Sequence, residues 1–349
     1  MPPFRKPKVT LWSGGIEGGI DEEKGKIRVL SSGLIPVLID RFQGSALGTF
    51  VGDAMGREVE GWSWEMIRAR HGILNRIGEG IYTDDTEMMI GIMEALKEDP
   101  GFDPALIARR FLENFHPFRG YGPRIYGIMD RLRQGIPWDQ VGTDSWGNGG
   151  AMRIAPVGFF FYDDGELLKE NALLCARITH THPQGLAGAL AQAMAVGMAT
   201  QKGITGDAIE RPVFLEEIVQ VVQGVDDALA AEIERIGEMD TGGDLEARIG
   251  RIASTFPRDV SAAGAVPPAI ASFLINDNFP ATVVTAINGG GDTDTIGAMA
   301  GAIAGAYYGY PSIPSEWLEP LENGAKGRDY VQSLAEELAG IKARQKGWI

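Results

Sequence analysis

Glycine recurs at every fourth position in two distant segments, and this spacing constrains the fold more than any other feature of the chain. The eight glycines are Gly44, Gly48, Gly52, Gly56, Gly297, Gly301, Gly305 and Gly309. A glycine inside a helix costs roughly 1 kcal/mol relative to alanine. A repeated ridge of glycines therefore needs a compensating gain, and close approach of two helices supplies one. We predict two buried helices in tight contact.

The same spacing also occurs in membrane helices, so a membrane protein is the competing interpretation. Asp40, Arg41 and Asp53 interrupt the first glycine segment, and the second segment is too short to span a bilayer. Residues 1–6 are not followed by the apolar run of a signal peptide. We therefore expect a cytoplasmic protein with no membrane partner.

Helical periodicity extends through most of the chain after Leu34, whereas alternating strand patterns are scarce. The best strand candidate is Val157–Tyr162, and a helical turn fits it equally well. The predicted helices are Leu34–Met55, Thr86–Leu96, Ala105–Phe115, Ile125–Arg133, Glu166–Thr179, Leu186–Gln201, Leu215–Gln220, Asp226–Ile236, Leu245–Ile252, Ala265–Asn276 and Ile296–Tyr308. The pattern predicts an all-α protein, with an N-terminal extension (1–32) before one catalytic domain (33–349).

The charge of the chain excludes one class of partner and limits the metals it can bind. Lys and Arg number 32 against 47 Asp and Glu, which gives a net charge of −15. Such a chain repels phosphate backbones, so we expect no nucleic-acid partner, and an anionic ligand would need metal ions or backbone N–H groups. One cysteine, Cys175, and four histidines argue against a zinc site built from Cys and His ligands.

Two acidic clusters stand at predicted helix starts. The first is Tyr82-Thr83-Asp84-Asp85-Thr86-Glu87, and the second is Gly289-Gly290-Gly291-Asp292-Thr293-Asp294-Thr295. Each cluster alone is explained by N-capping, because Thr and Asp accept hydrogen bonds from free N–H groups. Each cluster nevertheless contains more residues able to cap a helix than one helix start needs. If the two clusters met, their carboxylates would repel unless hard cations such as Mg²⁺, Mn²⁺ or Ca²⁺ neutralised them.

Five short motifs follow one another between about Leu34 and Tyr310. They are Gly52-Asp53-Ala54-Met55-Gly56 followed by Glu60, Tyr82-Thr83-Asp84-Asp85-Thr86, Gly147-Asn148-Gly149-Gly150-Ala151-Met152-Arg153, Thr179-His180-Thr181-His182-Pro183 and Gly290-Gly291-Asp292-Thr293-Asp294-Thr295. Their identity and order resemble the ADP-ribosylglycohydrolase family, which includes the dinitrogenase reductase-activating glycohydrolases. The resemblance implies a compact orthogonal helical bundle and a centre of two divalent cations, Mg²⁺ or Mn²⁺.

The resemblance also implies roles for particular residues. The implied metal ligands are Thr83, Asp84, Asp85, Asp292, Asp294 and Thr295, with Asp294 a candidate to bridge both ions. The implied catalytic residues are Glu60, Asp85 and Asp294. The implied ADP-ribose contacts are Gly122, Ser145, Trp146, Gly147, Asn148 and His180. For His180 and His182, local hydrogen bonding at a helix start is an alternative, and for Arg153 a buried salt bridge is favoured over a phosphate contact.

The implied activity is hydrolysis of the glycosidic bond between ADP-ribose and a protein side chain or small acceptor, by a chain that acts as a monomer. Two alternatives stay open: a catalytically silent ADP-ribose-binding relative, and a hydrolase of another ribosyl nucleotide. The sequence does not choose among ADP-ribosyl-arginine, ADP-ribosyl-serine, poly(ADP-ribose) and O-acetyl-ADP-ribose.

Overall fold

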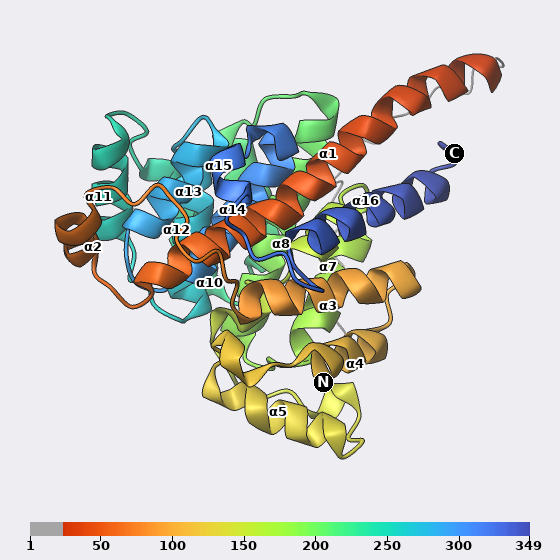
Figure 1. Ribbon diagram of the computed structural model, residues 1–349, viewed down its shortest axis with the longest axis horizontal. Coiled ribbons are helices and arrows are strands. Elements are labelled where there is room, and N and C mark those ends of the chain that lie inside the picture. The colour runs from red at the N-terminus through yellow and green to blue at the C-terminus, as the bar shows by residue number, and fades with distance from the viewer. Residues whose placement is uncertain (1–23) are drawn as a thin grey trace.

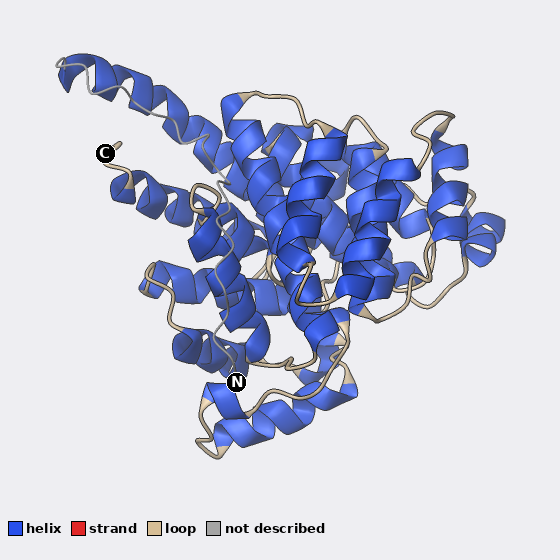
Figure 2. Cartoon of the chain, turned by 180° about the vertical axis from the view of Figure 1, so that it is seen from behind, coloured by secondary structure: helices blue, strands red, loops and turns tan. Residues whose placement is uncertain are grey.

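The computed structural model describes residues 24–349, with side chains from residue 33 onward, and over this range the chain is helical without a strand (Figures 1 and 2). The α-helices are α1 (Lys24–Gly56), α2 (Trp64–His71), α3 (Asp84–Glu98), α4 (Pro104–Asn114), α5 (Pro123–Arg133), α6 (Ala155–Phe160), α7 (Gly165–Arg177), α8 (Pro183–Thr205), α9 (Arg211–Val222), α10 (Asp227–Glu234), α11 (Leu245–Thr255), α12 (Ala262–Leu274), α13 (Phe279–Asn288), α14 (Thr293–Tyr308), α15 (Ser315–Leu318) and α16 (Arg328–Gln345). The all-α prediction is confirmed.

Helices α1 and α14 form the centre of the molecule, where they run antiparallel in direct backbone contact (Figure 1). Along the contact Gly44 faces Gly305, Gly48 faces Gly301, and Gly52 faces Gly297. A Cβ atom added at any of these six positions would lie within 3.0 Å of the opposite carbonyl oxygen. The predicted glycine contact is therefore confirmed, since no larger residue fits this interface without separating the helices.

The remaining helices surround this pair and bury its outer faces. Helix α8 packs on α14, and α16 packs on α1 and α3. The segment that resembled a strand, Val157–Tyr162, lies largely in α6, whose residues are all buried. No helix within residues 24–349 has the continuous apolar length that a bilayer crossing demands.

The expected boundary after residue 32 falls inside α1, which begins at Lys24 and continues to Gly56 without a break. The earlier part of the predicted extension, residues 1–23, lies outside the described residues. Three helices of eight or more residues were not predicted, namely α2, α13 and α16. Helix α13 begins with an Asn278 cap and Pro280 in its first turn, which is a recognisable start signal.

Candidate active site

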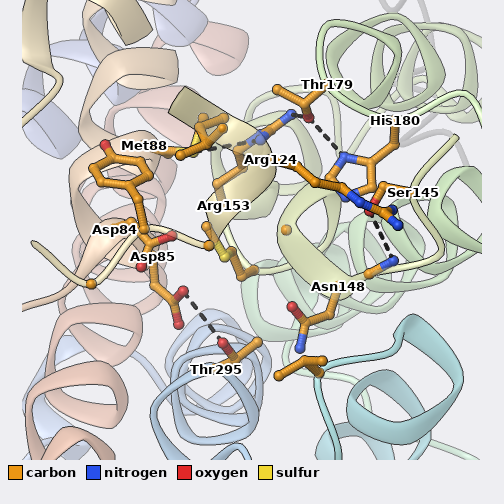
Figure 3. A pocket seen from close by; sticks show the side chains of 18 of the residues that line it. Asp84, Asp85, Met88, Arg124, Ser145, Asn148, Arg153, Thr179, His180 and Thr295 are labelled. Atoms are coloured by element: carbon orange, nitrogen blue, oxygen red, sulfur yellow. Dashed lines mark hydrogen bonds between the residues drawn. The ribbon is translucent and has the colours of Figure 1, made fainter. Parts of the chain in front are cut away.

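A cavity of about 410 Å³ opens between the starts of α3 and α14 on one side and two loops, residues 116–122 and 143–149, on the other (Figure 3). Every residue predicted for the site except Thr83 lines it. The lining members of that set are Glu60, Asp84, Asp85, Gly122, Ser145, Trp146, Gly147, Asn148, His180, Asp292, Asp294 and Thr295. Residues 60 and 294, far apart in sequence, thus meet in one cavity.

Thr83 serves as the N-cap of α3, as the capping interpretation predicts. Its Oγ1 accepts a hydrogen bond from the Asp85 N–H at 3.3 Å. The next two carboxylates are not used as caps and lie at the cavity wall. Asp85 Oδ2 is buried without a hydrogen-bond partner among the described residues, and Asp85 Oδ1 accepts from Thr295 Oγ1 at 3.4 Å. This last contact joins the two acidic clusters.

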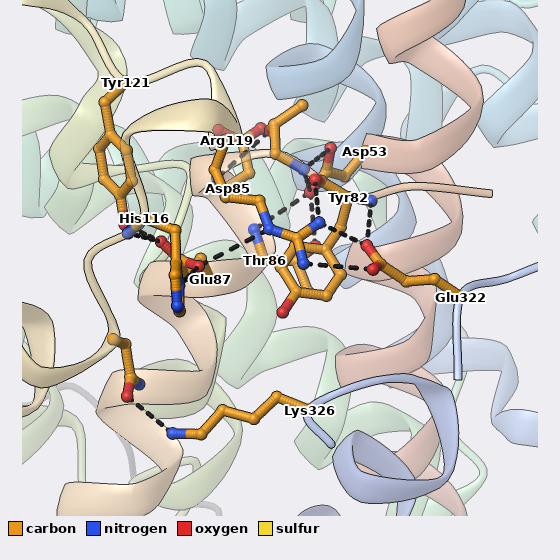
Figure 4. A network of polar contacts seen from close by, with 12 residues as sticks. Asp53, Tyr82, Asp85, Thr86, Glu87, His116, Arg119, Tyr121, Glu322 and Lys326 are labelled. Atoms are coloured by element: carbon orange, nitrogen blue, oxygen red, sulfur yellow. Dashed lines mark hydrogen bonds and ion pairs between the residues drawn. The ribbon is translucent and has the colours of Figure 1, made fainter. Parts of the chain in front are cut away.

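Asp53, from the glycine ridge of α1, fixes the start of α3 (Figure 4). Its fully buried carboxylate accepts from the Thr83 N–H at 3.0 Å, from the Thr86 N–H at 3.1 Å and from Thr86 Oγ1 at 2.6 Å. Burial raises its pKa to about 6, against the lowering effect of these hydrogen bonds. Sequence reasoning gave Asp53 no role, although a carboxylate within a small apolar ridge is itself a signal.

The second cluster is held by a close backbone approach that only glycine permits. Gly290 and Gly291 have positive φ angles of 78° and 88°. A Cβ at Gly291 would meet the carbonyl of Arg258, which accepts a hydrogen bond from the Asp292 N–H at 2.9 Å. Asn148 donates to Asp292 Oδ2 from the opposite loop. The three glycines thus bring the start of α14 against neighbouring backbone and place its carboxylates in the cavity.

Glu60, Asp292 and Asp294 each direct a carboxylate oxygen into a space where these atoms lie within 4.8 Å of one another. This group differs from the predicted ligand set, because it includes Glu60 in place of Asp84 and Asp85. Those two carboxylates occupy the facing wall of the same cavity. Glu60, expected only near the metals, therefore stands in position to be a ligand itself.

Burial and mutual repulsion raise the pKa values of these carboxylates. Burial, followed by Asp53, Asp292 and Glu60, raises the pKa of Asp84 to about 8. Burial and the neighbouring carboxylates hold the pKa of Asp85 and of Asp294 well above the usual range. Burial and Asp292 raise the pKa of Glu60 as well. An oxygen-rich site with this much unneutralised charge favours hard divalent cations.

The loop at residues 143–149 forms the wall opposite the carboxylates. Ser145 Oγ accepts from the Gly147 N–H at 3.2 Å, and the Asn148 N–H donates to the Val260 carbonyl at 3.0 Å. Trp146 projects from this loop with 44% of its surface exposed. A large aromatic side chain exposed at the rim of a polar cavity can stack on a flat ligand group.

The two histidines of the fourth motif have different surroundings. His180 is buried beside the cavity, and its Nδ1 lies 2.7 Å from Thr179 Oγ1. His182 caps α8, since its Nδ1 accepts from the Gln184 N–H at 3.1 Å. The local interpretation thus describes His182. His180 contacts the adjacent Thr179 and also lines the cavity, and its contact with a ligand stays a prediction.

Arg153 is buried in the lining of the cavity, but the favoured salt bridge does not form (Figure 3). Its guanidinium donates to Thr179 Oγ1 at 2.6 Å and to the Cys175 carbonyl at 3.2 Å. No carboxylate pairs with it within residues 33–349. The expectation was wrong because two neutral oxygens, at the C-terminal end of α7 and directly after it, accept hydrogen bonds from this cation in place of an acid.

The loop at residues 116–122, which carries Gly122, is tied to α3 by a buried carboxylate (Figure 4). Glu87 accepts from Tyr121 Oη at 2.7 Å and from the His116 N–H at 3.0 Å. Arg119 stacks 3.6 Å above the Tyr82 ring centre and pairs with Glu322. These contacts join segments that are far apart in the chain, and no sequence pattern predicted them.

Comparisons with known proteins agree with this geometry. The sequence profile described as ADP-ribosylglycohydrolase matches residues 35–347. An uncharacterized protein of Archaeoglobus fulgidus is 33% identical over 317 residues, covering 87% of this chain and 98% of its own length. ADP-ribosylhydrolase ARH3 of Gallus gallus is 31% identical over 348 residues, with 85% of this chain and 93% of that protein covered.

A solved structure shares the fold across nearly the same extent. The chain named ADP-ribosylglycohydrolase-related protein complex superimposes with a TM-score of 0.68 at 26% sequence identity. The match covers 88% of this chain and 99% of that chain. The segments that line the cavity all lie within residues 35–347, which the sequence profile matches.

Proposed function

The chain belongs to the ADP-ribosylglycohydrolase family, and we propose that it uses two Mg²⁺ or Mn²⁺ ions to hydrolyse the glycosidic bond of an ADP-ribose conjugate. The observation that carries the proposal is the convergence of the α3 and α14 starts on one cavity. Asp85 and Thr295, which lie 210 positions apart in sequence, are in hydrogen-bond contact there. The acceptor released with ADP-ribose is a protein side chain or a small molecule.

The residues present fit a pair of divalent cations. The donor set consists of oxygens alone, which suits Mg²⁺ and Mn²⁺. Asp85 Oδ2 is buried without a protein partner, an arrangement that is unfavourable unless a cation or a proton satisfies it. We assign the ligands to Asp84, Asp85, Asp292, Asp294 and Thr295, with Glu60 beside them; Thr83 contributes as the cap that orients this set.

When bound, such ions orient ribose hydroxyls, activate water and stabilise developing charge. The side chains of the protein supply the remaining chemistry. Glu60 is exposed at the edge of the carboxylate group, and its raised pKa makes its carboxylate a stronger proton acceptor than an ordinary glutamate. It takes the proton of the attacking water as the oxygen bonds to the anomeric carbon. The leaving group takes up a proton from solvent water as its bond to the anomeric carbon breaks, and Glu60 returns its proton to solvent. The carboxylates of Asp85 and Asp294 stabilise the oxocarbenium character of the sugar.

The opposite wall suits the rest of ADP-ribose. A glycine-rich loop can bind a diphosphate through its hydrogen-bond donors, and the basic side chains of Arg124 and Arg153 also line the cavity. We assign this role to the loop containing Ser145, Gly147 and Asn148, with Trp146 stacking on the base. The N–H groups of Gly147 and Asn148 already donate within the protein, which leaves the Ser145 hydroxyl as a donor to the ligand. Gly122 on the neighbouring loop leaves room for the ligand, since a Cβ there would meet nothing within 4 Å.

A hydrolysis panel tests the proposal. ADP-ribosyl-arginine, ADP-ribosyl-serine, poly(ADP-ribose) and O-acetyl-ADP-ribose are each incubated with Mg²⁺ or Mn²⁺, before and after chelation. We expect metal-dependent release of ADP-ribose from at least one of them. Asp294→Ala should reduce the rate by at least about 100-fold, because even groups that only orient metal ligands contribute 10–100-fold.

The matched control is Asp139→Ala, which removes an exposed carboxylate outside the cavity lining. It should retain full activity, and both variants should keep the helical circular dichroism of the parent. An Asp294→Ala enzyme that works at the parental rate would reject the metal assignment. Tight binding of ADP-ribose without release from any conjugate would favour the catalytically silent alternative.

A further inference from the structure

Arg153 donates to an oxygen that must also serve a second partner. An arginine side chain is always charged and carries only hydrogen-bond donors. Its contact with Thr179 Oγ1, at 2.6 Å, therefore uses that hydroxyl as an acceptor. The hydroxyl retains one proton, which it can donate elsewhere. The destination of this single proton determines the state of the neighbouring histidine.

Two acceptors lie within reach of the Thr179 proton, and one of them is already occupied. The Ala176 carbonyl is 3.5 Å from Thr179 Oγ1 and accepts from the N–H groups of Thr179 and His180, at 3.0 and 2.9 Å. His180 Nδ1 is nearer, at 2.7 Å. A carbonyl oxygen has two lone pairs, so the free acceptor at good distance is the imidazole nitrogen. Thr179 thus donates to His180 Nδ1.

We propose that Arg153 and Thr179 form a hydrogen-bond relay that holds His180 as the neutral tautomer with its proton on Nε2, as a donor to the ligand in the cavity. Both are positioning residues, because they act through the imidazole. Figure 3 shows the three side chains in line, from the buried guanidinium to the ring at the cavity wall. The identity of the ligand in this inference rests on the proposed function, whereas the tautomer of His180 does not.

The packing of His180 directs the other edge of its ring toward the ligand loop. A Cβ built at Gly149 would lie 3.2 Å from His180 Cε1 and 3.6 Å from Nε2, so glycine is needed for the loop to pass over the ring. Nε2 has no hydrogen-bond partner within residues 33–349. Burial, followed by Arg153 and Arg124, lowers the pKa of His180 to about 3, which agrees with a neutral ring.

The tautomer matters because ADP-ribose presents acceptor oxygens on its phosphates and both donor and acceptor hydroxyls. An Nε2–H group can donate to a phosphate or ribose oxygen. The alternative tautomer would direct a nitrogen lone pair at the same place and repel an anionic oxygen. The relay therefore prepares a neutral donor in an acidic protein without exposing a further cation to the cavity.

Nitrogen NMR of ¹⁵N-histidine-labelled protein tests the relay directly. The chain has four histidines, so the His180 signal is identified by its loss in His180→Gln. We expect a pyridine-type Nδ1 and an N–H-type Nε2 in the parent. Thr179→Val should redistribute the proton between the two nitrogens, and Thr179→Ser, which restores the hydroxyl, should restore the parental pattern. Thr181→Val, at an exposed threonine two positions away, is the matched control and should change nothing.

Titration calorimetry with ADP-ribose and Mg²⁺ on the same variants measures the consequence. Loss of one oriented hydrogen bond should weaken ADP-ribose binding about three- to tenfold in Thr179→Val, with recovery in Thr179→Ser. A proton on Nδ1 in the parent, or an unchanged tautomer in Thr179→Val, would overturn the relay. Parent protein with the expected tautomer that neither binds ADP-ribose nor hydrolyses any conjugate would instead refute the proposed function.

Discussion

The two walls of the cavity are built by different means. We call the starts of α3 and α14, with their carboxylates, the acidic wall, and the segments 116–122 and 143–149 the loop wall. The acidic wall is fastened to α1, through Asp53 on one side and through backbone contact with glycines on the other. The loop wall is held by fewer buried groups. The exposed fraction is 44% for Trp146 and 74% for Phe118.

This difference suits the roles that we propose for the two walls. Ligands of a cation have to be held within fractions of an ångström, which rigid helices achieve better than loops. A wall that meets a substrate benefits from exposed aromatic groups and from backbone that adapts to different acceptors. The glycine ridge is therefore part of the site in an indirect sense, because the spacing of α1 and α14 sets where the carboxylates of the acidic wall lie.

The largest effect should come from adding one methyl group beneath the acidic wall. Gly301→Ala places a Cβ within 3.0 Å of the Gly48 carbonyl oxygen, so the two helices must separate. We expect a loss of roughly 2–4 kcal/mol in the free energy of unfolding, measured by urea denaturation. The control lies beside the loop wall: Gly127 in α5 has no atom within 4 Å of a built Cβ. Gly127→Ala should leave stability unchanged or raise it by up to about 1 kcal/mol. Equal losses of stability in Gly301→Ala and Gly127→Ala would contradict the difference between the two walls.

Metal binding should stabilise the acidic wall almost as strongly. At a free Mg²⁺ concentration about 100 times its Kd, the folded state should gain about 2.7 kcal/mol over the chelated protein. The raised carboxyl pKa values also give the metal-free chain a pH dependence. Its folded state binds more protons than its unfolded state, so stability falls as pH rises from 3.8 toward about 8 for Asp84. Saturating Mg²⁺ should remove most of this fall. Denaturation curves that coincide with and without chelator at pH 8 would break the prediction.

Replacing Asp53 should separate the two walls functionally. Asparagine at this position cannot satisfy the three donor groups of Thr83 and Thr86 that the carboxylate accepts. We expect Asp53→Asn to lower stability by about 2 kcal/mol and to weaken Mn²⁺ binding by roughly 10–100-fold in calorimetry. Glu87→Gln, which loosens the loop wall through Tyr121 and His116, should retain the parental Mn²⁺ affinity. A similar loss of Mn²⁺ affinity in both would show that the walls act as one unit.

The smallest expected effect is confined to the rim of the loop wall. Trp146→Ala should weaken ADP-ribose binding by roughly 1–2 kcal/mol, the usual contribution of one aromatic stacked on a base. The free energy of unfolding should change by less than about 0.5 kcal/mol, because the side chain is half exposed. Trp146→Phe should keep most of the affinity. Unchanged ADP-ribose affinity in Trp146→Ala would remove this residue from the proposed site.

Local sequence patterns predicted the acidic wall, whereas the loop wall was predicted only through the family resemblance. Glycine at every fourth position and paired Thr and Asp residues are local patterns that few structures explain. They therefore predicted helices α1 and α14 and both acidic clusters. The capping explanation also proved correct for Thr83, which shows that one motif can serve two purposes. Helix α16 was missed although Val331, Leu334, Leu338 and Ala335 follow helical spacing.

The contacts that hold the site together were beyond prediction. Asp53 meets Thr83, Glu87 meets His116 and Arg153 meets Thr179 only because folded helices bring their segments together. Single polar residues produce no periodic pattern from which such contacts could be predicted. The mistaken salt bridge at Arg153 arose in this way, since a buried cation is usually paired with an acid.

The most direct test of the central claim is a crystal structure with Mn²⁺, in which anomalous scattering locates each ion. The account predicts two Mn²⁺ peaks between Asp85 and Asp294, coordinated by oxygens from the starts of both α3 and α14, and loss of at least one peak in Asp294→Ala. A cavity free of anomalous signal at saturating Mn²⁺, from protein that still releases ADP-ribose at the full rate, would contradict it.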